Sequence, residues 1–166
     1  MQITKMNLIL NEDCSTKLIK EYSKEYTGLD NLDTPEKVAD VMNKFFGLDK
    51  QAEEYLYLIS MTAKCKPIGF FEVTHGTCNA SMVGIREILI RALLSGAVNI
   101  IIAHNHPSGI SEASEQDLLV TQRLSEASNL IGLQFVDHII IGKDNYYSFH
   151  QNRMLSATQN NYLKTA

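Results

Sequence analysis

Three side chains that could bind a metal lie within one short stretch of the chain. His104 and His106 follow an apolar run two residues apart, and in an extended strand such residues project to the same face. The next helix begins near Ser114 and would bring Asp117 to the two imidazoles in its first turn. Two imidazoles and a carboxylate, with water in the fourth position, are the ligands of an open catalytic Zn²⁺ site. The sequence therefore predicts zinc at His104, His106 and Asp117, where the metal would lower the pKa of its water toward about 7.

The same residues have a simpler interpretation that needs no metal. Ser114 and Asp117 have nearly the spacing and types of a capping box, in which Asp117 would reach back to the helix N-terminus. His104 alone could be a hydrogen-bonded core histidine, and His106-Pro107 an ordinary turn. Two histidines on one face followed by an acid at a helix start are hard to obtain by capping alone, so the metal site is the favoured hypothesis.

A general base for such a site is expected at Glu72. This carboxylate lies within residues 68–73, which otherwise form an apolar strand. Burial of a carboxylate there costs free energy unless it has a partner or a task. The local pattern fits a solvent-facing edge residue equally well.

The elements that must position these groups are helices and strands in alternation. Thr34, Pro35 and Gly47 are typical of the N-cap, the first position and the C-terminal end of a helix. Apolar spacing predicts two further helices, from Ser81 to near Gly96 and from Ser114 to Gly132. Runs of apolar, β-branched and aromatic residues predict strands at 55–61, 68–73, 98–103, 133–141 and 146–149. This alternation indicates an α/β (mixed α+β) domain, a central sheet flanked by helices.

The 166 residues fit one domain with extensions at both ends. Residues 1–33 are the least regular part and are expected to form an N-terminal arm, partly helical around residues 16–26. Residues 34–150 carry the predicted domain, and residues 151–166 form a C-terminal tail. A homodimer could form through the arm or through an exposed sheet edge, although no residue pattern requires one.

Composition and charge narrow the class of function. Lys and Arg total 15 and Asp and Glu total 19, a net charge of −4, so binding to duplex DNA is expected to be weak or absent at physiological salt. The three cysteines are widely spaced and form no C-x-x-C pair, which suits a reducing compartment. No apolar run approaches the roughly 20 residues that a membrane helix needs. The sequence predicts a cytoplasmic protein with no membrane segment.

Several separated motifs resemble the bacterial RadC-like JAB proteins, within the JAMM (MPN+) metalloprotease superfamily. The JAMM-like residues are Glu72, His104, His106, Ser114 and Asp117. The RadC-like motifs are Glu72-Val73-Thr74-His75-Gly76-Thr77, Asn79-Ala80-Ser81, Arg86-Glu87, Ala103-His104-Asn105-His106-Pro107-Ser108-Gly109 and Asp137-His138-Ile139-Ile140-Ile141-Gly142. The resemblance covers about residues 34–150, most of the chain.

This resemblance implies a JAB/MPN fold, similar to the cytidine-deaminase-like sheet flanked by helices. It implies zinc on His104, His106 and Asp117, with Glu72 as general acid/base and Ser114 as a stabiliser of the oxyanion. The implied activity is zinc-dependent hydrolysis of peptide or isopeptide bonds in peptide or protein-conjugate substrates.

The chain departs from the family pattern in two places. Nothing in residues 1–33 resembles the helix-hairpin-helix-type region with which full-length RadC proteins usually begin. Gly84-Ile85 stands where the family commonly has His-Pro, directly before Arg86-Glu87. Two alternative functions stay open, a DNA-repair-associated accessory protein of the RadC type and a non-catalytic binding scaffold.

Other reactive side chains are assigned no chemistry. His75 is expected in a turn, and Asp137-His138 is expected to make a structural hydrogen bond near the end of the sheet. Cys78 is expected to be a small buried residue, and His150 is expected to face solvent.

Overall fold

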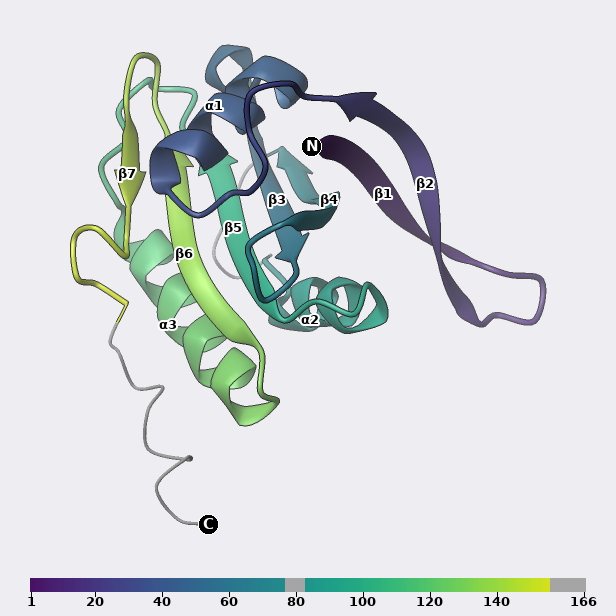
Figure 1. The fold of residues 1–166 in the computed structure, drawn as a ribbon. Coiled ribbons are helices and arrows are strands. Elements are labelled where there is room, and N and C mark those ends of the chain that lie inside the picture. The colour runs from purple at the N-terminus through teal and green to yellow at the C-terminus, as the bar shows by residue number, and fades with distance from the viewer. Residues whose placement is uncertain (77–82, 156–166) are drawn as a thin grey trace.

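A mixed sheet of seven strands organises the part of the chain that the computed structural model describes, residues 1–76 and 83–155 (Figure 1). Its strands are β1 (Gln2–Leu10), β2 (Thr16–Glu25), β3 (Glu54–Met61), β4 (Pro67–Gly76), β5 (Asn99–Asn105), β6 (Gln134–Ile141) and β7 (Tyr146–Ser148). They lie in the order β2-β1-β4-β3-β5-β6-β7. β1 runs parallel to β4 and β5 parallel to β6, whereas the other neighbours are antiparallel.

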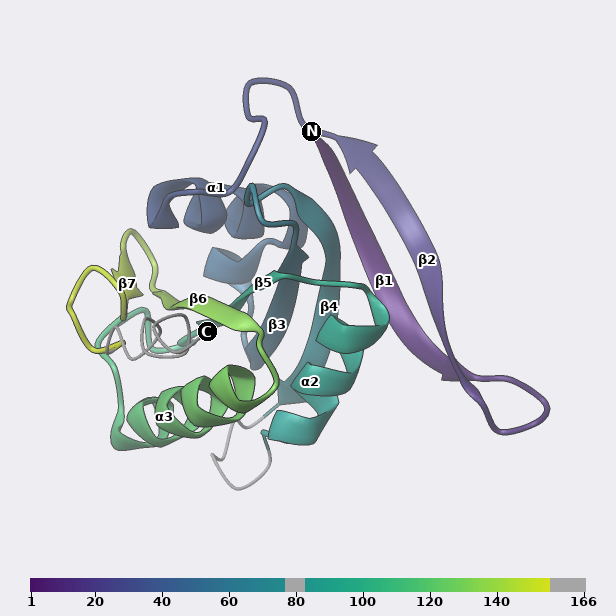
Figure 2. The same ribbon diagram turned by 60° about the horizontal axis from the view of Figure 1, so that its bottom comes forward.

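Helices cover both faces of the sheet. They are α1 (Pro35–Phe46), α2 (Ile85–Leu94) and α3 (Glu115–Leu130), and the short 3₁₀ helix η1 (Leu48–Lys50) follows α1. α1 lies on one face, and α2 and α3 lie on the other (Figure 2). The α/β architecture predicted from the alternation of elements is therefore confirmed. Among the described residues, no helix has the length and apolar character needed to cross a membrane.

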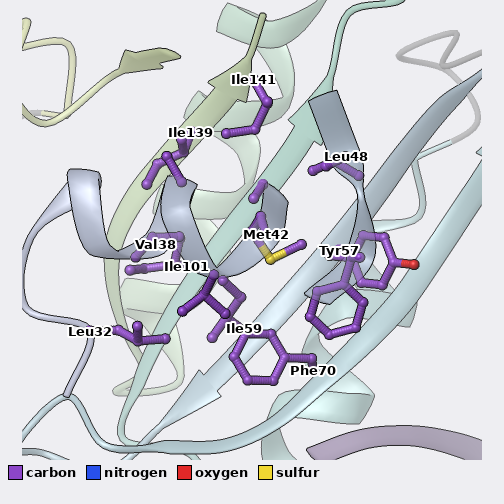
Figure 3. Close-up of a cluster of buried hydrophobic side chains, with 14 of the residues drawn as sticks. Leu32, Val38, Met42, Leu48, Tyr57, Ile59, Phe70, Ile101, Ile139 and Ile141 are labelled. Atoms are coloured by element: carbon purple, nitrogen blue, oxygen red, sulfur yellow. The ribbon is translucent and has the colours of Figure 1, made fainter. Parts of the chain in front are cut away.

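The core is divided by the sheet into two layers. Successive side chains of a strand point to opposite faces. Tyr57, Ile59 and Phe70 therefore pack on the α1 side (Figure 3), whereas Leu58 and Phe71 pack against α2 and α3. All seven residues of β5 are buried, as expected for a continuous apolar run between covered faces.

Local signals set the ends of the helices. The Oγ1 of Thr34 accepts a hydrogen bond from the backbone N–H of Lys37, and Pro35 is the first helical residue of α1. Gly47 ends α1 at φ 60°, in the left-handed region that glycine adopts most readily. The described part of α2 begins after Gly84, and the N-cap expected at Ser81 lies outside the described residues.

The helix expected around residues 16–26 is wrong, because these residues form the edge strand β2. β2 pairs with β1 along its whole length, and Thr4 Oγ1 lies 2.9 Å from Ser23 Oγ across the pair. β1 in turn lies beside β4 and buries Ile3 completely in the α1 layer. The N-terminal arm is thus a hairpin whose first strand belongs to the main sheet and whose tip projects from it (Figures 1 and 2).

The contribution of β1 to the core can be measured with two substitutions in the same strand. Ile3→Ala is expected to lower the free energy of unfolding by about 2–5 kcal/mol, because it leaves a cavity under α1. Leu10→Ala, at a position that is 65% exposed, is expected to change it by no more than about 0.5 kcal/mol. Urea denaturation measures both, and equal effects of the two substitutions would contradict this account of the arm.

Candidate metal centre

The end of β5 brings the two histidines together. His104 is 2% exposed, and its Nε2 lies 3.0 Å from the Nε2 of His106. The side chain of Asn105, between them, reaches instead toward the start of β3. The convergence predicted from the spacing of two residues is therefore present in the structure.

The first turn of α3 adds Asp117 to this pair. Its Oδ1 lies 3.1 Å from His104 Nε2, and its Oδ2 lies 3.5 Å from His106 Nε2. The same carboxylate completes a capping box: Oδ2 accepts from the backbone N–H of Ser114 at 2.8 Å and from its hydroxyl at 2.6 Å. The capping and metal-site interpretations describe one side chain in one position, so they do not exclude each other.

The electrostatics of the cluster keep Asp117 ionised. Burial raises the pKa of this carboxyl, but the imidazoles of His104 and His106 beside it outweigh burial and hold the pKa well below its usual range. The neighbouring carboxylate of Asp117 raises the pKa of His106, against the opposing effect of burial. An ionised carboxylate beside two imidazole nitrogens is a set of groups that a divalent cation would bridge.

The geometry of the three side chains fits zinc. In a tetrahedral site with metal–ligand bonds of about 2.0–2.1 Å, neighbouring ligand atoms lie about 3.3–3.4 Å apart. The two Nε2 atoms lie 3.0 Å apart, and the carboxylate of Asp117 lies 3.1 Å from His104 through Oδ1 and 3.5 Å from His106 through Oδ2, so the three side chains stand at about this spacing. The other ring nitrogen of His106, Nδ1, lies 2.8 Å from the carbonyl oxygen of Ile110, to which it can only donate. In the neutral ring, His106 Nε2 therefore keeps its lone pair for a metal.

Glu72, expected as the general base, is not brought to this cluster. It lies in β4, where its Oε2 is 3.4 Å from Lys5 Nζ and 3.3 Å from the hydroxyl of Tyr57. Tyr57 packs in the α1 layer, whereas its neighbour Leu56 packs on the other face of the sheet. Leu56 is the register partner of His104 in the β3–β5 pair. The placement of Glu72 beside the histidines is thus corrected: its partner is a lysine of β1.

A different carboxylate, Glu54, lies next to the histidines. It is the first residue of β3, and its Oε1 lies 3.9 Å from His106 Nε2. Ligand atoms of Glu54, His104 and His106 all lie within 4.8 Å of one another. Glu54 is two residues before Leu56, so both project to the face that holds His104. Sequence reasoning missed Glu54 because no local signal shows that β3, rather than β4, is the neighbour of β5.

The residue between the histidines holds the backbone of Glu54 in place. The Oδ1 of Asn105 accepts from the backbone N–H of Tyr55 at 2.9 Å, and its Nδ2 donates to the carbonyl of Glu53 at 2.9 Å. These two groups flank Glu54 on both sides, and the Asn105 side chain is almost completely buried. Because side chains alternate along β5, the two histidines converge on one face. Asn105, between them, points the other way and holds the backbone of Glu54.

The structure also gives His138 a partner at the site. Its Nε2 lies 2.8 Å from the Nδ1 of His104, and its Nδ1 lies 2.7 Å from the Oγ1 of Thr121. Burial lowers the pKa of His138 well below its usual value. His104, Asp117 and His138 form a second group whose ligand atoms lie within 4.8 Å of one another. The structural hydrogen bond expected for this residue therefore ends on a proposed metal ligand.

Two other reactive residues, His75 and His150, lie outside the cluster. His75 lies in strand β4 and not in the turn that was expected. Its ring stacks on Tyr55 with centroids 4.1 Å apart, and its Nε2 lies 2.5 Å from Glu53 Oε2. His150 is exposed, as expected. Cys78, and with it the motif at residues 79–81, lies outside the described residues.

The fold and the cluster together define an α/β protein with a histidine–aspartate site at the end of a central strand. The family model of the RadC-like JAB domain matches residues 32–154. The chain belongs to this family, which confirms the resemblance drawn from its motifs.

The chain is also similar to proteins named only as UPF0758 proteins. It is 42% identical to one from Chlorobium phaeovibrioides over 106 residues, 64% of this chain and 48% of that protein. It is 38% identical to one from Clostridium acetobutylicum over 123 residues, 74% of this chain and 52% of that protein. A third, from Pelobacter propionicus, is 34% identical over 127 residues, 76% of this chain and 55% of that protein. The chain thus spans about half the length of these relatives.

The two roles of Asp117 can be separated by measuring zinc per chain. Asp117→Ala is expected to lose most of the zinc, because it removes one of three ligands. Ser114→Ala removes the cap hydroxyl but keeps the carboxylate, so it is expected to retain zinc while losing about 1 kcal/mol of stability. Elemental analysis after removal of excess metal provides the comparison. Equal zinc in the wild type and Asp117→Ala would reduce Asp117 to a helix cap.

The support that Asn105 gives to Glu54 predicts a local effect on hydrogen exchange. Asn105→Ala leaves the Tyr55 N–H and the Glu53 carbonyl without their partner, a cost of about 1–3 kcal/mol if both stay buried. Exchange of the Tyr55 amide is expected to become faster, whereas that of Leu58 in the centre of β3 changes only with global stability. Unchanged exchange at Tyr55 would show that other contacts hold this end of β3.

Proposed function

We propose that the chain is a zinc-dependent hydrolase that cleaves peptide or isopeptide bonds in peptide or protein-conjugate substrates. The observation that carries the proposal is the position of a second carboxylate, Glu54, beside the ligand set of His104, His106 and Asp117. A structural zinc site is closed by four protein ligands, whereas a catalytic site has three protein ligands and keeps the fourth position for water. Membership of the RadC-like JAB family supports the same assignment.

Each protein group has a distinct task in this proposal. Zinc, when bound, supplies a water whose pKa is lowered to about 7 and polarises the substrate carbonyl. His104, His106 and Asp117 would hold the metal. Glu54 accepts a proton from the attacking water and returns it to the leaving amine, a role that general acid–base groups perform within hydrogen-bond reach of the reacting atoms.

Ser114 is the proposed donor to the oxyanion that forms when water adds to the carbonyl. Its hydroxyl donates to Asp117 Oδ2 at 2.6 Å, and its Oγ accepts the backbone N–H of Asp117 at 3.2 Å. To serve the substrate, the hydroxyl must turn its proton from the carboxylate to the substrate oxygen while the Oγ keeps the cap. The cap therefore fixes the position of Oγ, and only the hydroxyl proton would change its partner.

The assignment of Glu54 in place of Glu72 can be tested with two matched substitutions. In zinc-loaded protein, Glu54→Gln is expected to lower kcat by about 10²–10⁴-fold, because an amide cannot accept the proton. Its zinc content is expected to stay unchanged. Glu72→Gln is expected to keep wild-type activity, since Glu72 contacts Lys5 and Tyr57 on the α1 side of the sheet. A panel of fluorogenic peptides and lysine-linked isopeptides serves as the assay.

The reverse pattern, with activity lost only in Glu72→Gln, would contradict the assignment of the base. Zinc-loaded wild-type protein that cleaves none of these substrates would favour the binding-scaffold alternative.

A further inference from the structure

We propose that His138, oriented by Thr121, fixes the ring tautomer of His104 in which Nε2 keeps its lone pair for zinc. His138 is then a positioning residue behind the metal site and not a ligand. This inference rests on the proposed function, because it assigns His104 Nε2 as the atom that binds the metal. It is carried by a chain of three hydrogen bonds whose directions determine one another.

The first of these hydrogen bonds ends on the backbone of α3. The hydroxyl of Thr121 donates to the carbonyl oxygen of Asp117 at 2.6 Å, and a carbonyl can only accept. A hydroxyl has one proton, so the Thr121 oxygen must act as the acceptor toward His138 Nδ1, 2.7 Å away. His138 therefore carries its proton on Nδ1.

The proton on Nδ1 determines the rest of the chain. A neutral imidazole has one N–H, so the Nε2 of His138 is an acceptor. The atom that faces it at 2.8 Å is the Nδ1 of His104, which must therefore donate. His104 is left with a lone pair on Nε2, the atom that lies 3.0 Å from His106 Nε2 and 3.1 Å from Asp117 Oδ1. The directions of these hydrogen bonds thus leave His104 Nε2 unprotonated, as a zinc ligand must be.

The opposite order would block the site. If Thr121 donated to His138, then His138 would donate from Nε2 to His104, and His104 would carry its proton on Nε2. That proton would occupy the position of the metal. The carbonyl of Asp117 favours the productive order because it takes the only hydroxyl proton that Thr121 has. Asp117 thus has two roles: its carboxylate lies at the site, and its carbonyl accepts the first hydrogen bond of the series.

The surroundings of His138 hold its ring in this position. The side chain is 1% exposed, and its ring stacks on Phe149 with centroids 4.7 Å apart and an interplanar angle of 9°. Metal-binding histidines commonly donate their second ring nitrogen to an acceptor, and loss of that acceptor typically lowers metal affinity 10–100-fold. Here the acceptor is itself an imidazole, which can adopt either tautomer and so needs Thr121 to select one.

Substitutions at Thr121 and His138 test this series of hydrogen bonds in the 166-residue protein. Thr121→Val keeps the shape but removes the hydroxyl, and Thr121→Ser restores it. His138→Leu removes the acceptor, whereas His138→Gln offers an amide oxygen to His104 and an amide NH₂ to Thr121. Competition with a chromophoric chelator measures zinc affinity. Thr121→Val and His138→Leu are expected to bind zinc about 10–100-fold more weakly, while Thr121→Ser and His138→Gln stay near the wild type.

A second measurement reports the tautomers directly. Long-range ¹H–¹⁵N correlation spectra of the metal-free protein, at a pH where both rings are neutral, are expected to place the protons of His104 and His138 on Nδ1. In Thr121→Val, part of the His104 population is expected to carry its proton on Nε2. A merely structural role for His138 would lower stability without changing tautomer or zinc affinity in the folded protein.

Three outcomes separate this inference from the proposed function. Folded Thr121→Val with wild-type zinc affinity and wild-type tautomers would overturn the inference alone. A wild-type His104 with its proton on Nε2 would also overturn it. A wild-type protein that binds no zinc would overturn the proposed function, and the tautomer assignment would then stand or fall by the spectra.

Discussion

The alternation of side chains at the end of β5 is the constraint on which the site depends. His104 and His106 converge because they are two residues apart in an extended chain, and Asn105 must then project the other way. Asn105 uses this direction to hold the peptide groups on both sides of Glu54. One strand end therefore places two imidazoles directly and a carboxylate indirectly. Glu54 reaches the histidines only because the neighbouring strand β3 begins beside the end of β5.

The N-terminus of α3 supplies the remaining carboxylate and connects the site to the fold. Asp117 closes the capping box of the helix while its other oxygen faces His104. A helix N-terminus favours a negative charge, so the ionised carboxylate is stabilised there before any cation is bound. The carbonyl of the same residue accepts the hydroxyl of Thr121 one turn later. Metal binding and the formation of this helix end are therefore expected to stabilise each other.

The sequence was informative wherever a signal was local. Caps at Thr34 and Ser114, the stop at Gly47, the buried strand β5 and the convergence of its histidines with Asp117 all follow from residue types at short spacing. The helix expected in residues 16–26 failed because lysines and glutamates spaced along these residues suit a helix surface as well as an edge strand. Pairing with β1, which is not a local property, decided in favour of the strand.

The wrong placement of Glu72 and the two site residues that the sequence did not reveal, Glu54 and His138, share one cause. Glu72 was chosen because it interrupts an apolar strand, and that signal was sound, since the carboxylate does have a partner. The partner is Lys5, on the strand β1, which the sequence did not predict. Glu72 and Lys5 meet on the face of the sheet away from the histidines. Glu54 and His138 could be recognised only once the order of the strands was known, because each reaches the histidines from a different neighbour of β5.

The proposed zinc ligands are His104, His106 and Asp117, with His138 behind them. X-ray absorption spectroscopy at the zinc edge of the zinc-loaded protein distinguishes these ligands from other sets. Four nitrogen or oxygen ligands at about 2.0–2.1 Å are expected, with outer-shell scattering from two imidazoles and no sulfur. Scattering from three imidazoles would make His138 a ligand, and a sulfur shell or failure to retain zinc would contradict the site itself.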